Sequence, residues 1–196
     1  MTRASAAGIH PSVHAIGDHA NTIALDAFAE VGCRGRIEHA QLVAIADLPR
    51  FARLGVAASV QPDHALDDRD VADRMWAGRT ERAFPLRSLL DAGARVLLGS
   101  DAPVSPLDPW ITIAAAVGRT RGGREPWHPE QAISIADAIA ASTRSTVAVG
   151  QPADLVVVEI DPLKASVDEL REMPVRSTVL AGRVTYGASL ESRHGG

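Results

Sequence analysis

The sequence of 196 residues has very little of several features that would narrow its function at once. Its single cysteine, Cys33, excludes an internal disulfide and a cysteine-rich zinc site. Lys164 is the only lysine, and a formal charge of −4 leaves no basic stripe for nucleic acid. Apolar runs stay short of the roughly 18 residues that a membrane span needs, and residues 1–8 lack the apolar core of a signal peptide. We therefore expect a soluble cytoplasmic protein that binds neither nucleic acid nor membrane.

The remaining composition, 46% hydrophobic and 22% charged, is that of a globular chain that can bury a core. Hydrophobic patterning predicts strands at 8–15, 36–40, 56–61 and 96–98, and helices at 20–31, 47–54, 86–92, 110–117 and 133–141. Residues 63–83 are expected to form a long loop with a helical piece around 71–76. From residue 147 the period changes to that of strands, at 153–159 and in a hairpin over 175–186. Strands that alternate with helices indicate an α/β fold with a parallel sheet, followed by a small β appendage.

The strand expected at 96–98 leads directly to a carboxylate, Asp101. An unbroken apolar run is typical of a strand that is covered on both faces, as in parallel sheets. A carboxylate is costly to bury unpaired, and the carboxyl ends of such strands are where ligands bind. We therefore expect Asp101 to face a functional site. The alternative is that Asp101 caps the next helix or orders the turn before Pro103.

Two other expected strands end in a histidine, His14 and His39. Because parallel strands bring their carboxyl ends to one edge, these imidazoles and Asp101 are expected to meet there. Two imidazoles and a carboxylate suit zinc, and also iron or manganese. We predict that His14, His39 and Asp101 hold a divalent metal, with zinc favoured, and that Asp101 moves the proton of an activated water. Taken singly, each histidine could instead be a hydrogen-bonded structural residue.

Two further residues are weaker candidates for substrate binding. His64 follows the third expected strand and could contact substrate or lie in a surface loop. Arg79 lies in the expected long loop and could hold an anionic group of the substrate, although a solvated charge is the simpler interpretation.

Several segments, in this order along the chain, resemble the YtcJ-like branch of the metal-dependent amidohydrolases, amidohydrolase family 3. They are residues 14–18 (HAIGD), 36–41 (RIEHAQ), 59–64 (SVQPDH), 89–94 (LLDAGA), 99–103 (GSDAP) and 153–157 (ADLVV). The resemblance implies a (β/α)8 barrel with a small β-sandwich, in which His14, His39, Gln61 and Asp101 end strands five to eight. It also implies His14, His39 and Asp101 as metal ligands, and hydrolysis of carbon–nitrogen bonds other than peptide bonds.

The family's first-strand His-x-His pair has no counterpart in this sequence, and neither has its bridging lysine on strand four. The resemblance therefore implies the carboxyl-terminal half of such an enzyme. We expect residues 1–146 to form strands five to eight of the barrel, 147–187 to form part of the sandwich, and 188–196 to form a tail. The expected partners are a small-molecule substrate and either a second copy of the chain or the missing amino-terminal half.

These observations favour a metal-dependent amidohydrolase in truncated form, and we expect the isolated chain to bind metal weakly and to show little turnover. Two alternatives stay open: a non-catalytic remnant or assembly module, and a lyase or isomerase on the same scaffold, since a fold does not fix the chemistry.

Overall fold

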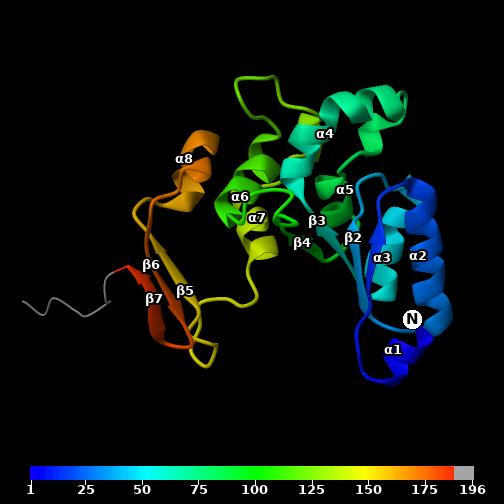
Figure 1. Cartoon of the computed structure of the whole chain (residues 1–196), viewed down its shortest axis with the longest axis horizontal. Helices are drawn as coiled ribbons and strands as arrows, with labels where there is room; N and C mark the ends of the chain where they lie inside the picture. The colour runs from blue at the N-terminus through cyan, green and yellow to red at the C-terminus, as the bar shows by residue number, and fades with distance from the viewer. Residues whose placement is uncertain (188–196) are drawn as a thin grey trace, which may run out of the picture.

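The computed structural model describes residues 1–187, and a four-stranded parallel sheet lies at its centre (Figure 1). The strands pair in chain order, and they are β1 (Ser12–Ala15), β2 (Gly35–His39), β3 (Val56–Val60) and β4 (Val96–Leu98). Each strand ends within one residue of its predicted carboxyl end, although β1 begins four residues later than predicted. The predicted α/β fold with a parallel sheet is therefore confirmed, and the tail expected at 188–196 lies outside the described residues.

Eight α-helices connect and cover the strands of the described chain. They are α1 (Thr2–Ala6), α2 (Asp18–Val31), α3 (Leu48–Leu54), α4 (Pro62–Met75), α5 (Leu86–Asp91), α6 (Pro109–Gly118), α7 (Ile135–Ser142) and α8 (Val167–Arg171). Short 3-10 turns occur at Ile45–Asp47, Thr80–Arg82, Pro129–Gln131 and Pro162–Lys164. Gly32 and Gly55 end α2 and α3 in the left-handed conformation, each with φ of 65°, which glycine adopts without steric cost.

The core lies between the sheet and the helices that follow its strands. Helix α2 buries Leu25 and Phe28 on the face where its apolar residues recur at helical spacing. Ile37 of β2 and Val60 of β3 are also fully buried. Burial of these side chains is the main favourable term that keeps the helices on the sheet.

A second, antiparallel sheet contains β5 (Leu155–Val158), β6 (Val175–Leu180) and β7 (Arg183–Gly187). It lies at one end of the molecule, beyond α6 and α7 (Figure 1). Helix α8 packs against α6, where the bare backbone of Gly118 lets Val167 approach; a Cβ at Gly118 would come within 2.5 Å of Val167 Cγ1. The residue-147 boundary predicted from sequence falls in the connection between α7 and β5.

The loop expected over most of 63–83 is wrong, because residues 62–75 form the 14-residue helix α4, while the helical piece expected around 71–76 lies mostly within that helix. Its many aspartates interrupt the apolar periodicity from which helices were predicted. Several of these aspartates pair with residues 119–127, which are distant in the sequence. Helix α8 also escaped prediction. Its signal was the capping box of Ser166 and Glu169, in which each side chain bonds the other residue's backbone N–H.

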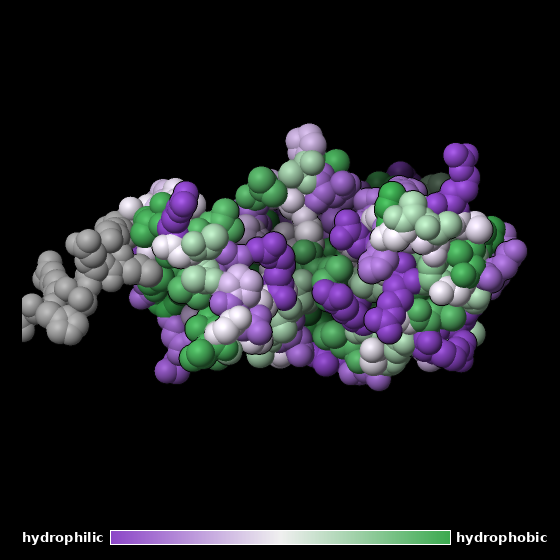
Figure 2. Space-filling view, turned by 90° about the horizontal axis from the view of Figure 1, so that it is seen from below, coloured by the Kyte–Doolittle hydropathy of each residue, from purple (hydrophilic) through white to green (hydrophobic). Residues whose placement is uncertain are grey.

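Within residues 1–187, the helices are too short or too polar to cross a membrane. Viewed from below, hydrophilic and hydrophobic residues are interspersed over the surface (Figure 2).

Replacement of Gly35 by alanine is expected to destabilise the fold by about 1–3 kcal/mol, the usual cost of overpacking. The new Cβ would lie 2.3 Å from the carbonyl oxygen of Pro11 and 2.7 Å from Phe28 Cε1. Urea unfolding measures the loss. Gly99→Ala is the matched control, because a Cβ there has open space. Equal stability of the two variants would contradict this account of the packing.

Candidate metal centre

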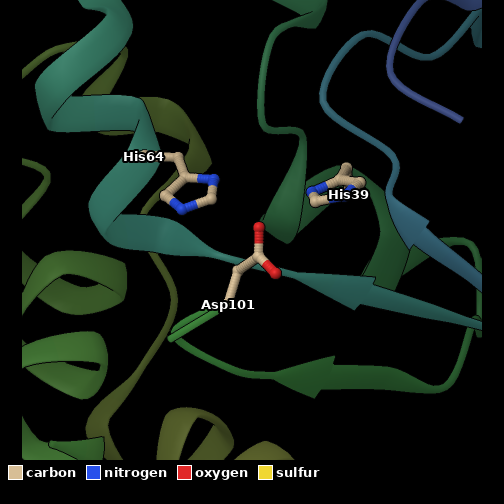
Figure 3. Close-up of side chains that lie close together, drawn as sticks. All are labelled: His39, His64 and Asp101. Atoms are coloured by element: carbon tan, nitrogen blue, oxygen red, sulfur yellow. The ribbon is translucent and has the colours of Figure 1, made fainter. Parts of the chain in front are cut away.

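Three side chains converge at the carboxyl edge of the parallel sheet (Figure 3). His39 is the last residue of β2, His64 lies in the first turn of α4 just after β3, and Asp101 follows β4. One ligand atom from each lies within 4.8 Å of the others. Because they come from three consecutive βα units, the parallel topology is what brings them together.

Gln61 sets the orientation of the His39 ring. Its Oε1 lies 2.9 Å from His39 Nδ1, while its Nε2 donates to the Ser59 carbonyl at 3.3 Å. Since an amide oxygen only accepts, His39 Nδ1 carries the proton and Nε2 keeps a free lone pair. Metal-binding histidines are commonly fixed in this way by an acceptor on the other ring nitrogen. Gln61 was missed as an orienting residue, although a polar residue at a strand end was a visible signal.

His64 is 6% exposed, and its Nε2 is buried with no hydrogen-bond partner among the described residues. A buried polar atom without a partner is costly, and a metal ion or a water molecule at Nε2 would remove that cost. The His64 ring stacks on that of His39, with 6.2 Å between centroids and 18° between planes. The Asp101 carboxylate lies between the two rings in Figure 3, and this residue is exposed.

The backbone at this edge is strained. His39 and Asp101 have φ of 76° and 55°, in the left-handed region that residues with a side chain rarely adopt. Such a conformation costs on the order of 1–3 kcal/mol and persists where the surroundings impose it, often at functional sites. The alternative role for Asp101 as a helix cap does not apply to α6, whose cap is Asp108.

The structure places the other two candidate residues outside this group of three. The exposed His14 ring lies beside His39, edge-on, with 4.6 Å between the centroids. Arg79 pairs with Asp18 at 3.3 Å, and its side chain is 45% exposed.

A polar row crosses one face of the sheet next to the candidate ligands. Glu38 accepts hydrogen bonds from Ser12 Oγ and from Arg36 Nε, the latter at 2.5 Å. Burial raises the pKa of the Glu38 carboxyl, but hydrogen bonds from Ser12, Ser59 and Arg36 outweigh it and hold the pKa below its usual value.

A family model described as the amidohydrolase family matches residues 1–186 of the chain. The chain belongs to the amidohydrolase family. The resemblance found in the sequence motifs is thereby confirmed.

Among curated proteins, this amidohydrolase chain is 40% identical over 152 residues to Protein LONG AFTER FAR-RED 3 of Arabidopsis thaliana, covering 72% of the chain and 26% of that protein. It is 31% identical over 205 residues to the N-substituted formamide deformylase of Arthrobacter pascens, covering 94% and 38%. It is 29% identical over 209 residues to the putative amidohydrolase YtcJ of Bacillus subtilis, covering 96% and 40%. The chain thus spans 26–40% of the length of these relatives.

Among solved structures, an uncharacterized metal-dependent hydrolase from Pyrococcus horikoshii superposes with a TM-score of 0.65 at 36% identity, covering 71% of this chain and 29% of that one. The match shows that the chain shares part of its fold with that protein, which is described as a metal-dependent hydrolase.

Glu38→Gln is expected to reduce the dependence of stability on acid pH. Because the pKa of folded Glu38 lies below that of an unfolded glutamate, its stabilising effect is present above the unfolded pKa and is lost as the pH falls through the folded one. Urea unfolding between pH 7 and pH 3 should show the variant less stable than wild type at neutral pH and nearly equal to it in acid. A constant difference across this range would refute the assignment.

Proposed function

We propose that the chain carries the metal-binding edge of a hydrolase that cleaves a carbon–nitrogen bond, other than a peptide bond, in a small molecule. The convergence of His39, His64 and Asp101 is the observation that carries the proposal. Membership of the amidohydrolase family supports it. The similarity to a protein named for its action on N-substituted formamides supports a carbon–nitrogen bond as the target.

The donor set fits a divalent metal. His39 offers Nε2 because Gln61 occupies Nδ1, and His64 offers a buried Nε2 that lacks another partner within residues 1–187. The Asp101 carboxylate adds an oxygen and a negative charge. Imidazole nitrogens with one carboxylate favour zinc, and also suit iron or manganese. His14 is proposed as a further ligand, since its ring lies against that of His39.

Each residue then has a separate task. A divalent metal held by these residues would lower the pKa of a coordinated water. Asp101, exposed at the end of its strand, would take a proton from the water as its oxygen bonds to the substrate carbon, and would give that proton to the nitrogen as the carbon–nitrogen bond breaks. Gln61 holds His39 in the required tautomer. Arg79 is proposed to hold an anionic group of the substrate, and to do so it would have to release the carboxylate of Asp18, with which it pairs at 3.3 Å.

We also propose that β1–β4 are a part of a (β/α)8 barrel and that β5–β7 belong to a composite β-sandwich. In the described sheet β1 and β4 are the outer strands, each with one edge that has no strand beside it. A cavity of about 650 Å³ opens at the amino ends, lined by residues from all four strands, among them Ser12, Arg36, Ala57 and Leu97. Both features support a partner, the remaining barrel strands, that covers this face.

His39→Ala and Asp101→Asn are each expected to weaken zinc binding more than tenfold. Loss of a residue that only orients a metal ligand already costs about 10- to 100-fold, and these substitutions remove a ligand itself. Titration calorimetry measures the change. His128→Ala is the matched control, because its ring pairs with Glu130 outside the site.

The same zinc-loaded protein is to be assayed for amine release from a panel of small amides and formamides, and for turnover of a panel without amides. Amine release that EDTA abolishes supports the proposal. Turnover confined to the second panel would identify a lyase or isomerase. Absence of stoichiometric zinc binding would leave the non-catalytic alternative.

A further inference from the structure

Helix α4, which carries His64, presents one acidic face to a neighbouring segment. We call this segment, residues 119–127, the strap. The pairs are Arg121 with Asp63 and Asp67, Arg124 with Asp70, and the Trp127 indole N–H with Asp73. Three of these pairs, 67 with 121, 70 with 124 and 73 with 127, join residues 54 positions apart. Strap and helix therefore stay in step over about two helical turns.

The pairs along the strap differ in burial. The Asp63 side chain is 3% exposed, and Arg121 approaches it at 3.2 Å. In contrast, Arg124 and Asp70 are 47% and 70% exposed. Exposed pairs contribute little to stability, whereas a buried carboxylate that loses its cation is strongly unfavourable. Arg121 is therefore the strap residue on which the first turn of α4 depends.

Asp63 and His64 are consecutive residues in that first turn, so any shift that brings Asp63 to water also moves His64. On the basis of the function proposed above, we propose that Arg121 is a positioning residue that holds His64 at metal-binding distance from His39 and Asp101. Within residues 1–187, Arg121 forms ion pairs with Asp63 and Asp67 of α4 but none with Asp101, so it acts on the site through α4.

Helix α8 contacts the strap near its start. Arg171 of α8 donates to the carbonyl oxygen of Thr120 at 3.0 Å, one residue before Arg121. Gly118, at the end of α6, packs closely on Val167 of α8. Helix α8, which connects β5 to β6 of the antiparallel sheet, is thus linked to α4 and the candidate metal centre through the strap.

The test is a Co²⁺ titration of the full chain, followed by the visible absorption of the bound ion, which reports its ligands. Arg121→Ala is expected to weaken Co²⁺ binding at least tenfold, the lower range for loss of a residue that orients a ligand, and to change the spectrum. Arg124→Ala is the matched control. It makes the same change in the same strap but breaks an exposed pair far from His64, so its affinity and spectrum should equal those of wild type.

A double variant separates positioning from loss of stability. Asp63→Asn removes the buried charge that drives the shift, so Asp63→Asn/Arg121→Ala should regain most of the Co²⁺ affinity lost in Arg121→Ala. Urea unfolding of every variant confirms that the titrations are made on folded protein.

The outcomes are distinct. The inference is wrong if Arg121→Ala binds Co²⁺ as wild type does, if Arg124→Ala is equally impaired, or if the double variant does not recover. It is also wrong if His64→Ala leaves Co²⁺ binding unchanged, which would make His64 a substrate contact instead. If wild type binds no Co²⁺, the proposed function fails as well.

Discussion

The parallel register of β1–β4 is the constraint on which the candidate site depends. Hydrogen bonding pairs Ala15 with His39 and Glu38 with Ser59, and the strands run in one direction throughout. The segments that leave these strands therefore start from one edge. A change of direction in any strand would send its terminal residue to the opposite side of the molecule. The hydrogen-bonded backbone of the parallel sheet thus fixes where the site lies, and the side chains determine what it binds.

The same register explains the polar row beside the site. Side chains alternate between the two faces of a strand, so Ser12, Glu38 and Ser59 lie on one face while Val13, Ile37 and Ala58 face the helices. The polar side chains pair with one another, so their groups are satisfied on a face without covering helices. The sheet can therefore bury apolar residues such as Ile37 and Ala58 on one face and carry paired polar groups on the other.

Much of this arrangement could be predicted from sequence, and the remainder could not for physical reasons. Short β-rich runs that end in His39 and Asp101 located the strands and the edge, because strand length and terminal polarity are local properties. Only the helical piece around 71–76 was predicted, and the rest of α4 was missed because its acidic residues pair with Arg121 and Arg124, 54 positions away, which no local pattern reveals. His64 was expected to contact substrate or to lie in a surface loop, whereas the structure buries it in α4. Whether His14 or His64 supplies the second imidazole nitrogen, beside that of His39, depends on a ring orientation that spacing does not encode.

The strap contains no candidate catalytic residue, yet its ion pairs contribute to the stability of the helix that carries His64. A row of aspartates alone would repel itself and weaken its helix. Paired with guanidinium groups, the row instead fixes the helix against a segment that is also attached to α8. The arginine-rich composition thus has a structural use here: one guanidinium, that of Arg121, reaches two carboxylates at once.

The left-handed backbone of Asp101 restricts which residues could replace it. Asparagine and glycine visit that conformation far more readily than alanine or a β-branched residue. Asparagine would therefore remove the charge while preserving the chain path, whereas alanine would combine a chemical loss with a conformational penalty. The backbone conformation at position 101 therefore favours aspartate, asparagine and glycine over other residues, whatever chemistry the side chain performs.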